Sequence, residues 1–160
     1  MLVDALSFEL AGSRYALLTS FVTEVVRAVA IEALPSAPGI VSGVINLRGQ
    51  VIAVVDMRRR LGLPPRPVVP EDYFIIVELN GLRLALHVDR ALDLLNVSPI
   101  PLARVAPSPF DEARYIAGVV PTGEGVLLVQ DLPAFLSHAD SVQLGEALRA
   151  RHEHEQRSAS

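Results

Sequence analysis

Apolar residues along the chain come in short runs of Val, Ile and Leu separated by Gly, Pro and Asn, a pattern typical of short β-strands. The first two runs, Val3–Leu10 and Arg14–Thr19, flank Ala11-Gly12-Ser13. Gly12 can adopt the positive φ that a tight turn requires, so these residues predict a β-hairpin.

A second hairpin is predicted where Ile75–Leu79 and Leu82–Val88 flank Asn80-Gly81, because Asn-Gly between two apolar runs is a strong hairpin signal. In the second arm every other residue is Leu or Val, and the intervening residues include Arg83, His87 and Asp89. This alternation predicts a strand with one buried face and one polar face, with His87 on the polar face.

An internal repeat relates the two halves of the chain. Six of ten positions are identical between FELAGSRYAL at Phe8–Leu17 and VELNGLRLAL at Val77–Leu86. In the same order, GVINLRGQVIAVVD at Gly43–Asp56 is echoed by GVVPTGEGVLLVQD at Gly118–Asp131. We therefore expect two similar subdomains of about 70 residues, which share a hydrophobic core because a unit of that size rarely holds enough core alone.

Helical signals are local. Asp56 can cap a short helix over Met57–Leu61, and Asp140 with Gln143 forms a capping box before an amphipathic C-terminal helix. Residues 151–160 are charged and small, so we expect a disordered tail. The organisation predicted is a single domain over residues 1–150 followed by this tail, with the proline-rich segment Ser98–Phe110 as the best candidate for a mobile loop.

Composition excludes several classes of function. The net charge of −4 and 5% aromatic content leave little basic field or stacking surface for nucleic acid. All 14 basic residues are arginine, so a Walker-type phosphate loop or a Schiff-base lysine is excluded. No segment has the length and apolarity to insert into a bilayer and the first residues do not form a secretory signal, so a cytoplasmic location is expected.

No catalytic constellation, resident metal or cofactor is predicted. Gly39–Gly43 has the wrong spacing for a nucleophile elbow, and the carboxylates do not single out an acid–base pair. The run His152–Glu155 lacks fixed ligand geometry in a solvated tail, and Arg58–Arg60 are expected to form a solvated face.

The most unusual remaining feature is the turn Asn46-Leu47-Arg48-Gly49 between two apolar strands, where an arginine suits a protein interface. With its continuation GVINLRGQVIAVVDMRRRLGL at Gly43–Leu63, this turn resembles the core motif of the CheW-like domain family, the adaptors of bacterial chemosensory arrays. Supporting residues are Tyr15-Ala16-Leu17, Val22-Thr23-Glu24-Val25, Leu34-Pro35 with Pro38, Val88-Asp89, and Tyr115–Val119. The sequence departs from the family pattern at Ala53, Met57 and Arg90-Ala91.

The resemblance implies an all-β fold with short helices, in which two five-stranded β-barrel subdomains pack on a shared hydrophobic core and a C-terminal helix follows. It also implies non-catalytic bridging between the regulatory domain of a CheA-type histidine kinase and the cytoplasmic tip of a chemoreceptor. Exposed aliphatic side chains would form the docking surfaces of such an adaptor, which would explain the 51% apolar content. The receptor- or kinase-coupling residues it implies are Val22, Glu24, Asn46, Arg48 and Gly49, and the motif residues with structural roles are Asp56, Asp89 and Gly118.

Other functions remain open at this point. A CheW-like adaptor could serve a pilus or surface-sensing pathway rather than a flagellar one. A small-ligand or oligonucleotide-binding barrel is disfavoured by the acidic charge and few aromatics. A hydrolase is disfavoured further, since no nucleophile, base and orienting residue can be named.

Overall fold

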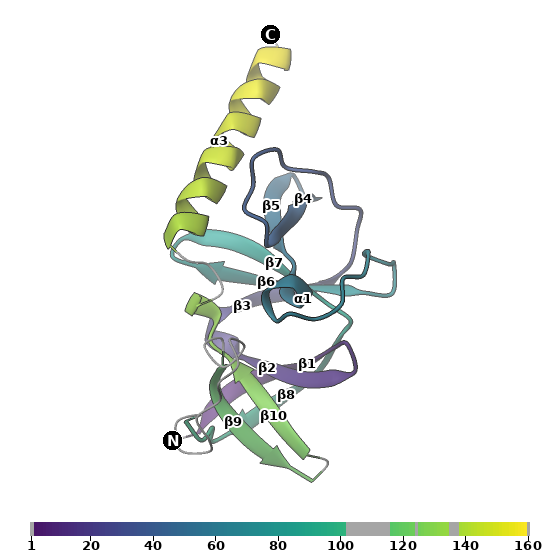
Figure 1. Ribbon diagram of the computed structural model, residues 1–160, viewed down its shortest axis with the longest axis vertical. Helices are drawn as coiled ribbons and strands as arrows, with labels where there is room; N and C mark the ends of the chain where they lie inside the picture. The colour runs from purple at the N-terminus through teal and green to yellow at the C-terminus, as the bar shows by residue number, and fades with distance from the viewer. Residues whose placement is uncertain (1, 102–115, 124, 135–137, 160) are drawn as a thin grey trace.

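The computed structural model describes residues 2–101, 116–123, 125–134 and 138–159, and its described part contains ten strands and four helical segments (Figure 1). The strands are β1 (Val3–Leu10), β2 (Ser13–Leu18), β3 (Val22–Arg27), β4 (Val41–Leu47), β5 (Gln50–Val55), β6 (Tyr73–Leu79), β7 (Leu82–Val88), β8 (Arg90–Val97), β9 (Ile116–Thr122) and β10 (Gly125–Gln130). The helical segments are the 3₁₀ turns η1 (Thr19–Phe21) and η3 (Leu132–Ala134), and the α-helices α1 (Met57–Arg60) and α3 (His138–Ala159).

These strands form two five-stranded sheets. Sheet A has the order β8-β1-β2-β10-β9 and lies in the lower half of Figure 1, whereas sheet B has the order β3-β6-β7-β5-β4 and lies above it. Neighbouring strands are antiparallel except for β2 with β10 and β5 with β7, which are parallel. The two predicted hairpins are confirmed as β1–β2 and β6–β7, whose turn residues Ala11, Gly12, Asn80 and Gly81 all have positive φ.

The repeat is present, but its halves do not build separate sheets. The hairpin β1–β2 of the first half lies in sheet A, while β3, β4 and β5 of the same half lie in sheet B. The second half does the reverse, with β6–β7 in sheet B and β8, β9 and β10 in sheet A. The expectation of two contiguous subdomains of about 70 residues is therefore corrected to two sheets that exchange hairpins.

Neither sheet is a closed barrel, which corrects the other part of the fold prediction. Among the described residues, backbone pairing across the open side of each sheet is a single bridge: Glu32, in the segment after β3, pairs with Val44 of β4 in sheet B, and Ile100, after β8, pairs with Val119 of β9 in sheet A. Each bridge approaches a glycine that occupies the same position in the repeat. A Cβ on Gly43 would lie 2.1 Å from the Glu32 carbonyl oxygen, and one on Gly118 would lie 3.1 Å from the Ile100 carbonyl oxygen. The repeated glycines therefore leave room for the bridging segments.

Both faces of the central strands are buried, and this accounts for much of the apolar content. In β6, Ile75 and Val77 belong to a core shared by the two sheets, while Phe74 and Ile76 face a second core within sheet B. Sheet A has its own smaller core, which includes Ala5. The shared core confirms the predicted packing of the two units, whereas the explanation of the apolar content by exposed docking surfaces is replaced by this two-sided burial.

Helix α3 begins against the shared core and projects from the body of the protein (Figure 1). Leu144 and Ala147 are buried there, and Arg151 pairs with Glu32 at 3.1 Å. The helix continues through Ala159, which differs from the disorder expected for residues 151–160. Side-chain pairing explains the difference in part, because Arg151 also contacts Glu155 one turn later at 3.0 Å. Most of Ser98–Phe110, and Tyr115 of the family motif, lie outside the described residues.

Candidate functional site

The turn between β4 and β5 presents Arg48 to solvent. Leu47 pairs with Gln50, which leaves Arg48 and Gly49 as a two-residue loop with φ values of 51° and 87°, the left-handed pair of a type I′ turn. The Asn46 side-chain oxygen accepts a 2.8 Å hydrogen bond from the Gly49 amide. Asn46 and Gly49 thus shape the turn on which Arg48 stands.

Arg48 forms an ion pair with Glu24 of β3, the strand at the opposite edge of sheet B. The Arg48 side chain is 66% exposed and that of Glu24 is 29% exposed. Together with the bridge between Glu32 and Val44, the pair links the two outer strands of the sheet. The structure therefore brings Glu24, Asn46, Arg48 and Gly49 into one site, which we call the Arg48 site.

Val22 lies on the same strand but is turned away from the Arg48 site by a β-bulge. Val22 pairs with Val77 and Glu24 with Ile76, so Thr23 is the additional residue. The bulge lets Val22 pack on the core shared by the sheets, whereas Val26, further along β3, packs on the core within sheet B. Val22 and Glu24 consequently contribute to different surfaces.

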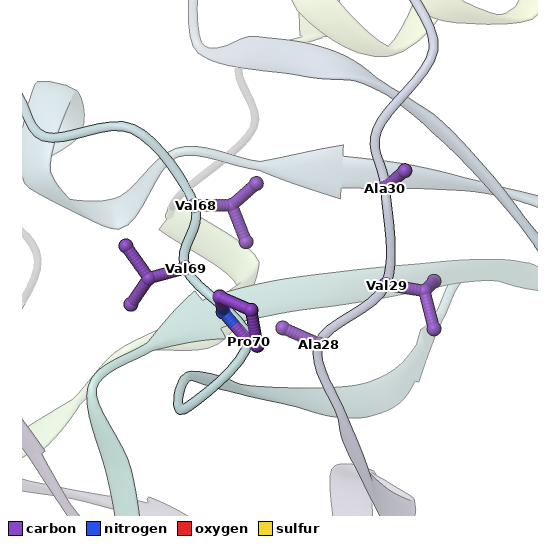
Figure 2. Close-up of a pocket in the computed structure, with 6 residues that line it drawn as sticks. All are labelled: Ala28, Val29, Ala30, Val68, Val69 and Pro70. Atoms are coloured by element: carbon purple, nitrogen blue, oxygen red, sulfur yellow. The ribbon is translucent and has the colours of Figure 1, made fainter.

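An apolar hollow of about 290 Å³ lies beyond the end of β3 (Figure 2). One wall is the segment 28–30 and the other is the segment 68–70 of the loop before β6. The side chains of Ala28 and Val68 project into the space between these two backbone segments (Figure 2). This hollow, which we call the sheet B hollow, was not predicted from the sequence.

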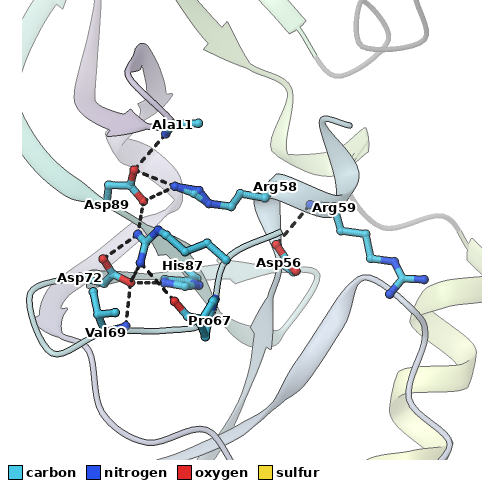
Figure 3. A network of polar contacts seen from close by, with 10 residues as sticks. Ala11, Asp56, Arg58, Arg59, Pro67, Val69, Asp72, His87 and Asp89 are labelled. Atoms are coloured by element: carbon cyan, nitrogen blue, oxygen red, sulfur yellow. Dashed lines mark hydrogen bonds and ion pairs between the residues drawn. The ribbon is translucent and has the colours of Figure 1, made fainter. Parts of the chain in front are cut away.

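A buried polar cluster lies where the two sheets meet, and comprises Arg58, Arg66, Asp72, His87 and Asp89 (Figure 3). Arg58 donates to both carboxylate oxygens of Asp89 at 2.8 Å. Arg66 donates to Asp72 at 2.8 and 3.0 Å and to Asp89 at 2.6 Å. His87 contacts Asp72 through Nε2 at 2.7 Å. The cluster thus joins α1, the loop before β6, and the end of β7.

Two backbone amides complete the coordination of these carboxylates. The Ala11 amide, in the β1–β2 turn of sheet A, donates to Asp89 at 2.9 Å, and the Val69 amide donates to Asp72 at 3.1 Å. Figure 3 shows Ala11 and Val69 at opposite ends of the cluster, with the two carboxylates between them. Asp89 therefore connects sheet A to elements packed on sheet B.

Hydrogen bonding lowers the pKa of both carboxylates against the effect of burial. Burial alone would raise the pKa of Asp72, but hydrogen bonds from Arg66, His87 and the Val69 amide lower it to about 2. For Asp89, burial is likewise outweighed by the Ala11 amide and the two arginines, and its pKa is lowered. The pKa of Arg66 is raised, mainly by its hydrogen bond to Asp72. All three groups are held in their charged forms.

Several expectations from the sequence are corrected by this cluster. His87 is not on an exposed polar face: it is buried, with Asp72 beside it and the edge of Phe74 against its ring. Arg58 and Arg60 are not solvated, since Arg58 pairs with Asp89 and Arg60 with Asp140 of α3 at 2.9 Å. The sequence predicted a solvated face because the partners of these arginines lie far away along the chain.

Asp56, for which the sequence predicted a capping role, is the N-cap of α1 and accepts a 3.2 Å hydrogen bond from the Arg59 amide. Arg66 and Asp72 were not singled out from the sequence. A usable signal was present, because a histidine within an apolar strand needs a polar partner when it is buried. A charged residue directly before a strand, such as Asp72 before Tyr73, is one place to look for that partner.

The described residues hold no cluster of three or more His, Asp or Glu side chains suited to a metal ion. Among the helices of that same part of the chain, none is both long and apolar enough to cross a membrane.

Comparison with known proteins places these features in a family. A sequence model described as the CheW-like domain matches residues 4–140. The "Chemotaxis protein CheW" of Treponema pallidum is 26% identical over 149 residues, covering 86% of this chain and 84% of that protein. Its namesake in Rhizobium meliloti is 32% identical over 109 residues, covering 68% of this chain and 66% of that protein.

A solved structure agrees in fold. The scaffolding protein TtCheW from Thermoanaerobacter tengcongensis superposes with a TM-score of 0.74 at 28% sequence identity, covering 88% of this chain and 91% of that one. The family match, which spans most of the chain, and the superposition point to the same assignment. This chain belongs to the CheW-like domain family.

Proposed function

We propose that this chain is a non-catalytic adaptor that couples chemoreceptors to a CheA-type histidine kinase in a cytoplasmic chemosensory array. One surface would dock the regulatory domain of the kinase and another the helical tip of a receptor. Support comes from the family membership and from relatives named as chemotaxis and scaffolding proteins. An adaptor of this kind needs two interfaces that are each modest, because combined occupancy fixes the assembly.

The observation that carries the proposal is the conformation of Arg48. A left-handed backbone costs a residue with a side chain roughly 1–2 kcal/mol, and Arg48 has a φ of 51°. The exposed pair with Glu24 returns about 0–1 kcal/mol, so stability alone does not account for arginine at this position. The equivalent turn positions hold Asn80, a type that tolerates this conformation, and Ala11, whose amide is held by Asp89. We infer that Arg48 serves an interface.

The buried polar cluster supports a non-catalytic role. A general base that works near neutral pH needs a pKa near that pH, whereas the pKa of Asp72 is about 2. The Asp72 and Asp89 carboxylates also already accept hydrogen bonds from arginines and amides. These groups stabilise the fold in the state described.

The test is a titration of the chain against its cognate CheA-type kinase and against a receptor cytoplasmic fragment. Arg48→Ala should unfold at nearly the wild-type temperature, because the pair it breaks is exposed. Its affinity for one of the two partners should fall by about 5- to 150-fold, the effect of truncating an interface anchor worth roughly 1–3 kcal/mol. Arg90→Ala is the matched control, since the Arg90 side chain is 63% exposed, close to the 66% of Arg48, but lies on β8 of sheet A.

The possible outcomes test the assignment of Arg48 and the adaptor function independently of each other. If folded Arg48→Ala binds both partners like the wild type, the assignment of Arg48 is wrong while the adaptor function stands. If the wild-type chain binds neither the receptor fragment nor a kinase that retains its regulatory domain, the adaptor function itself is wrong.

A further inference from the structure

The buried polar cluster connects two surface hollows that lie on different sheets. One is the sheet B hollow, whose wall at 68–70 is fixed by the bond from the Val69 amide to Asp72. The other, of about 320 Å³, is lined by Gly12 of the β1–β2 turn and by residues of β2, β9 and β10. That turn is fixed by the bond from the Ala11 amide to Asp89. Each hollow therefore has one wall tied to a carboxylate of the cluster.

A single guanidinium joins the two carboxylates. The same Arg66 Nη2 atom lies 2.8 Å from Asp72 and 2.6 Å from Asp89. The backbone carbonyl of Asp72 also accepts a 2.9 Å hydrogen bond from the Ala28 amide, so Asp72 holds both walls of the sheet B hollow. The path from turn to loop runs through Asp89, Arg66 and Asp72, and each link in it is charge-assisted.

We propose that Asp89, Arg66 and Asp72 form a relay that couples the β1–β2 turn of sheet A to the loop 66–72 of sheet B, so that the two segments open together. A buried charge is costly once its partner leaves. If one end opens, the carboxylate at the other end loses part of its compensation through the shared Arg66. A ligand that holds the wall of one hollow in place would consequently stabilise the wall of the other.

The exposure of the side chains in the cluster indicates that Arg66 is the residue that moves when the two segments open. Arg66 is 32% exposed, whereas the Arg58 side chain is only 6% exposed and that of Asp72 is 4% exposed. Arg66 can therefore turn to solvent while Arg58 stays on Asp89. The open state is one in which Arg66 has left both carboxylates and the β1–β2 turn and loop 66–72 have loosened.

Amide hydrogen exchange tests the coupling, because it reports the opening of individual segments. Asp89→Asn should speed exchange of the Val69 amide, although that amide is bonded to Asp72. Asp72→Asn should likewise speed exchange of the Ala11 amide, and we expect about tenfold in each case, because each substitution weakens a charge-assisted hydrogen bond to Arg66. Asp93→Asn is the matched control, because Asp93 is an exposed aspartate on β8, and it should change neither amide.

Arg66→Gln provides a second, milder test because Arg66 is partly exposed. Arg66→Gln should speed exchange of both the Ala11 and the Val69 amide. The double variant Arg66→Gln with Asp89→Asn should exchange the Val69 amide at the same rate as Arg66→Gln alone. The proposal is overturned if each aspartate variant affects only the amide bonded to the substituted carboxylate. It is also overturned if the amides of β4 and β5, away from the cluster, accelerate equally, because that pattern reports global unfolding alone.

Discussion

Replacing Gly43 with alanine should open the link between the outer strands of sheet B. A Cβ at this position would lie 2.1 Å from the Glu32 carbonyl oxygen and 2.8 Å from a methyl group of Ile31. No side-chain rotation relieves the first contact, because the atom it meets belongs to the backbone. The segment that carries Glu32 must therefore move away from Val44.

The cost follows from the bonds that this movement breaks. The Glu32 amide donates to the Val44 carbonyl at 2.8 Å, and the Val44 amide donates to the Glu32 carbonyl at 2.8 Å. Two backbone hydrogen bonds are worth about 1–3 kcal/mol together. Gly43 also has a φ of +153°, which adds roughly 1 kcal/mol of strain for alanine. We expect the free energy of unfolding to fall by about 3 kcal/mol.

Two further glycines supply an internal scale. Gly118 holds the same position in the repeat, but a Cβ there would meet Pro99 Cβ at 2.9 Å and the Ile100 oxygen at 3.1 Å, so Gly118→Ala should cost less, about 1 kcal/mol. Gly123 has open space around it, and Gly123→Ala should stay within about 0.5 kcal/mol of the wild type. The predicted order of destabilisation is Gly43, then Gly118, then Gly123.

The assay is urea denaturation followed by far-UV circular dichroism, since the chain has no tryptophan for fluorescence. Amide exchange at Glu32 and Val44 gives the local readout, and both amides should lose protection in Gly43→Ala. A Gly43→Ala variant that keeps wild-type stability would show that the bridge is not a close backbone contact. A larger loss for Gly118→Ala than for Gly43→Ala would equally refute the reasoning.

Two other predictions concern acid and the C-terminal helix. The pKa of Asp72 falls from its ordinary 3.8 to about 2 on folding, so its contribution of about 2 kcal/mol is complete above pH 3.8 and is lost as the pH falls toward 2. The difference in the free energy of unfolding between the wild type and Asp72→Asn should accordingly be smaller at pH 3 than at pH 7 in the same denaturation assay. Ending the chain after Arg151 should change the free energy of unfolding by less than about 0.5 kcal/mol, because the side chains of 152–158 are exposed. Ending it after Gln143 removes buried Leu144 and Ala147 and should cost more than about 3 kcal/mol in the same assay.

The features that could be predicted from the sequence are those set by near neighbours in the chain. Asn80-Gly81 and the glycine of Ala11-Gly12 fix their hairpins through local backbone preference, and Asp56 caps α1 from the adjacent residue. The turn at Arg48 belongs to the same group, since Asn46 reaches only three residues along the chain to the Gly49 amide. Local chemistry was enough to predict the turn that carries Arg48, whereas Glu24, which lies 24 residues away along the chain, was implied only by the family resemblance.

The buried polar cluster could not be predicted because its partners are distant in sequence. Alternation in β7 correctly placed His87 opposite Leu86, but whether that second face meets water depends on the loop 66–72 that covers it. Likewise the arginines of α1 appear solvated in a short helix until Asp89 and Asp140 arrive from other elements. Sequence alternation gives the face of a residue, whereas its burial depends on the tertiary packing.

The exchange of hairpins gives the repeat a physical consequence that sequence similarity alone does not. If β1–β2 paired within its own half, each half could close a sheet without the other, and cutting the chain between β5 and β6 would yield two folded units. In the observed order β1–β2 pairs with β8 and β10, while β6–β7 pairs with β3 and β5. Every sheet therefore requires both halves, and unfolding should be a single cooperative transition rather than two.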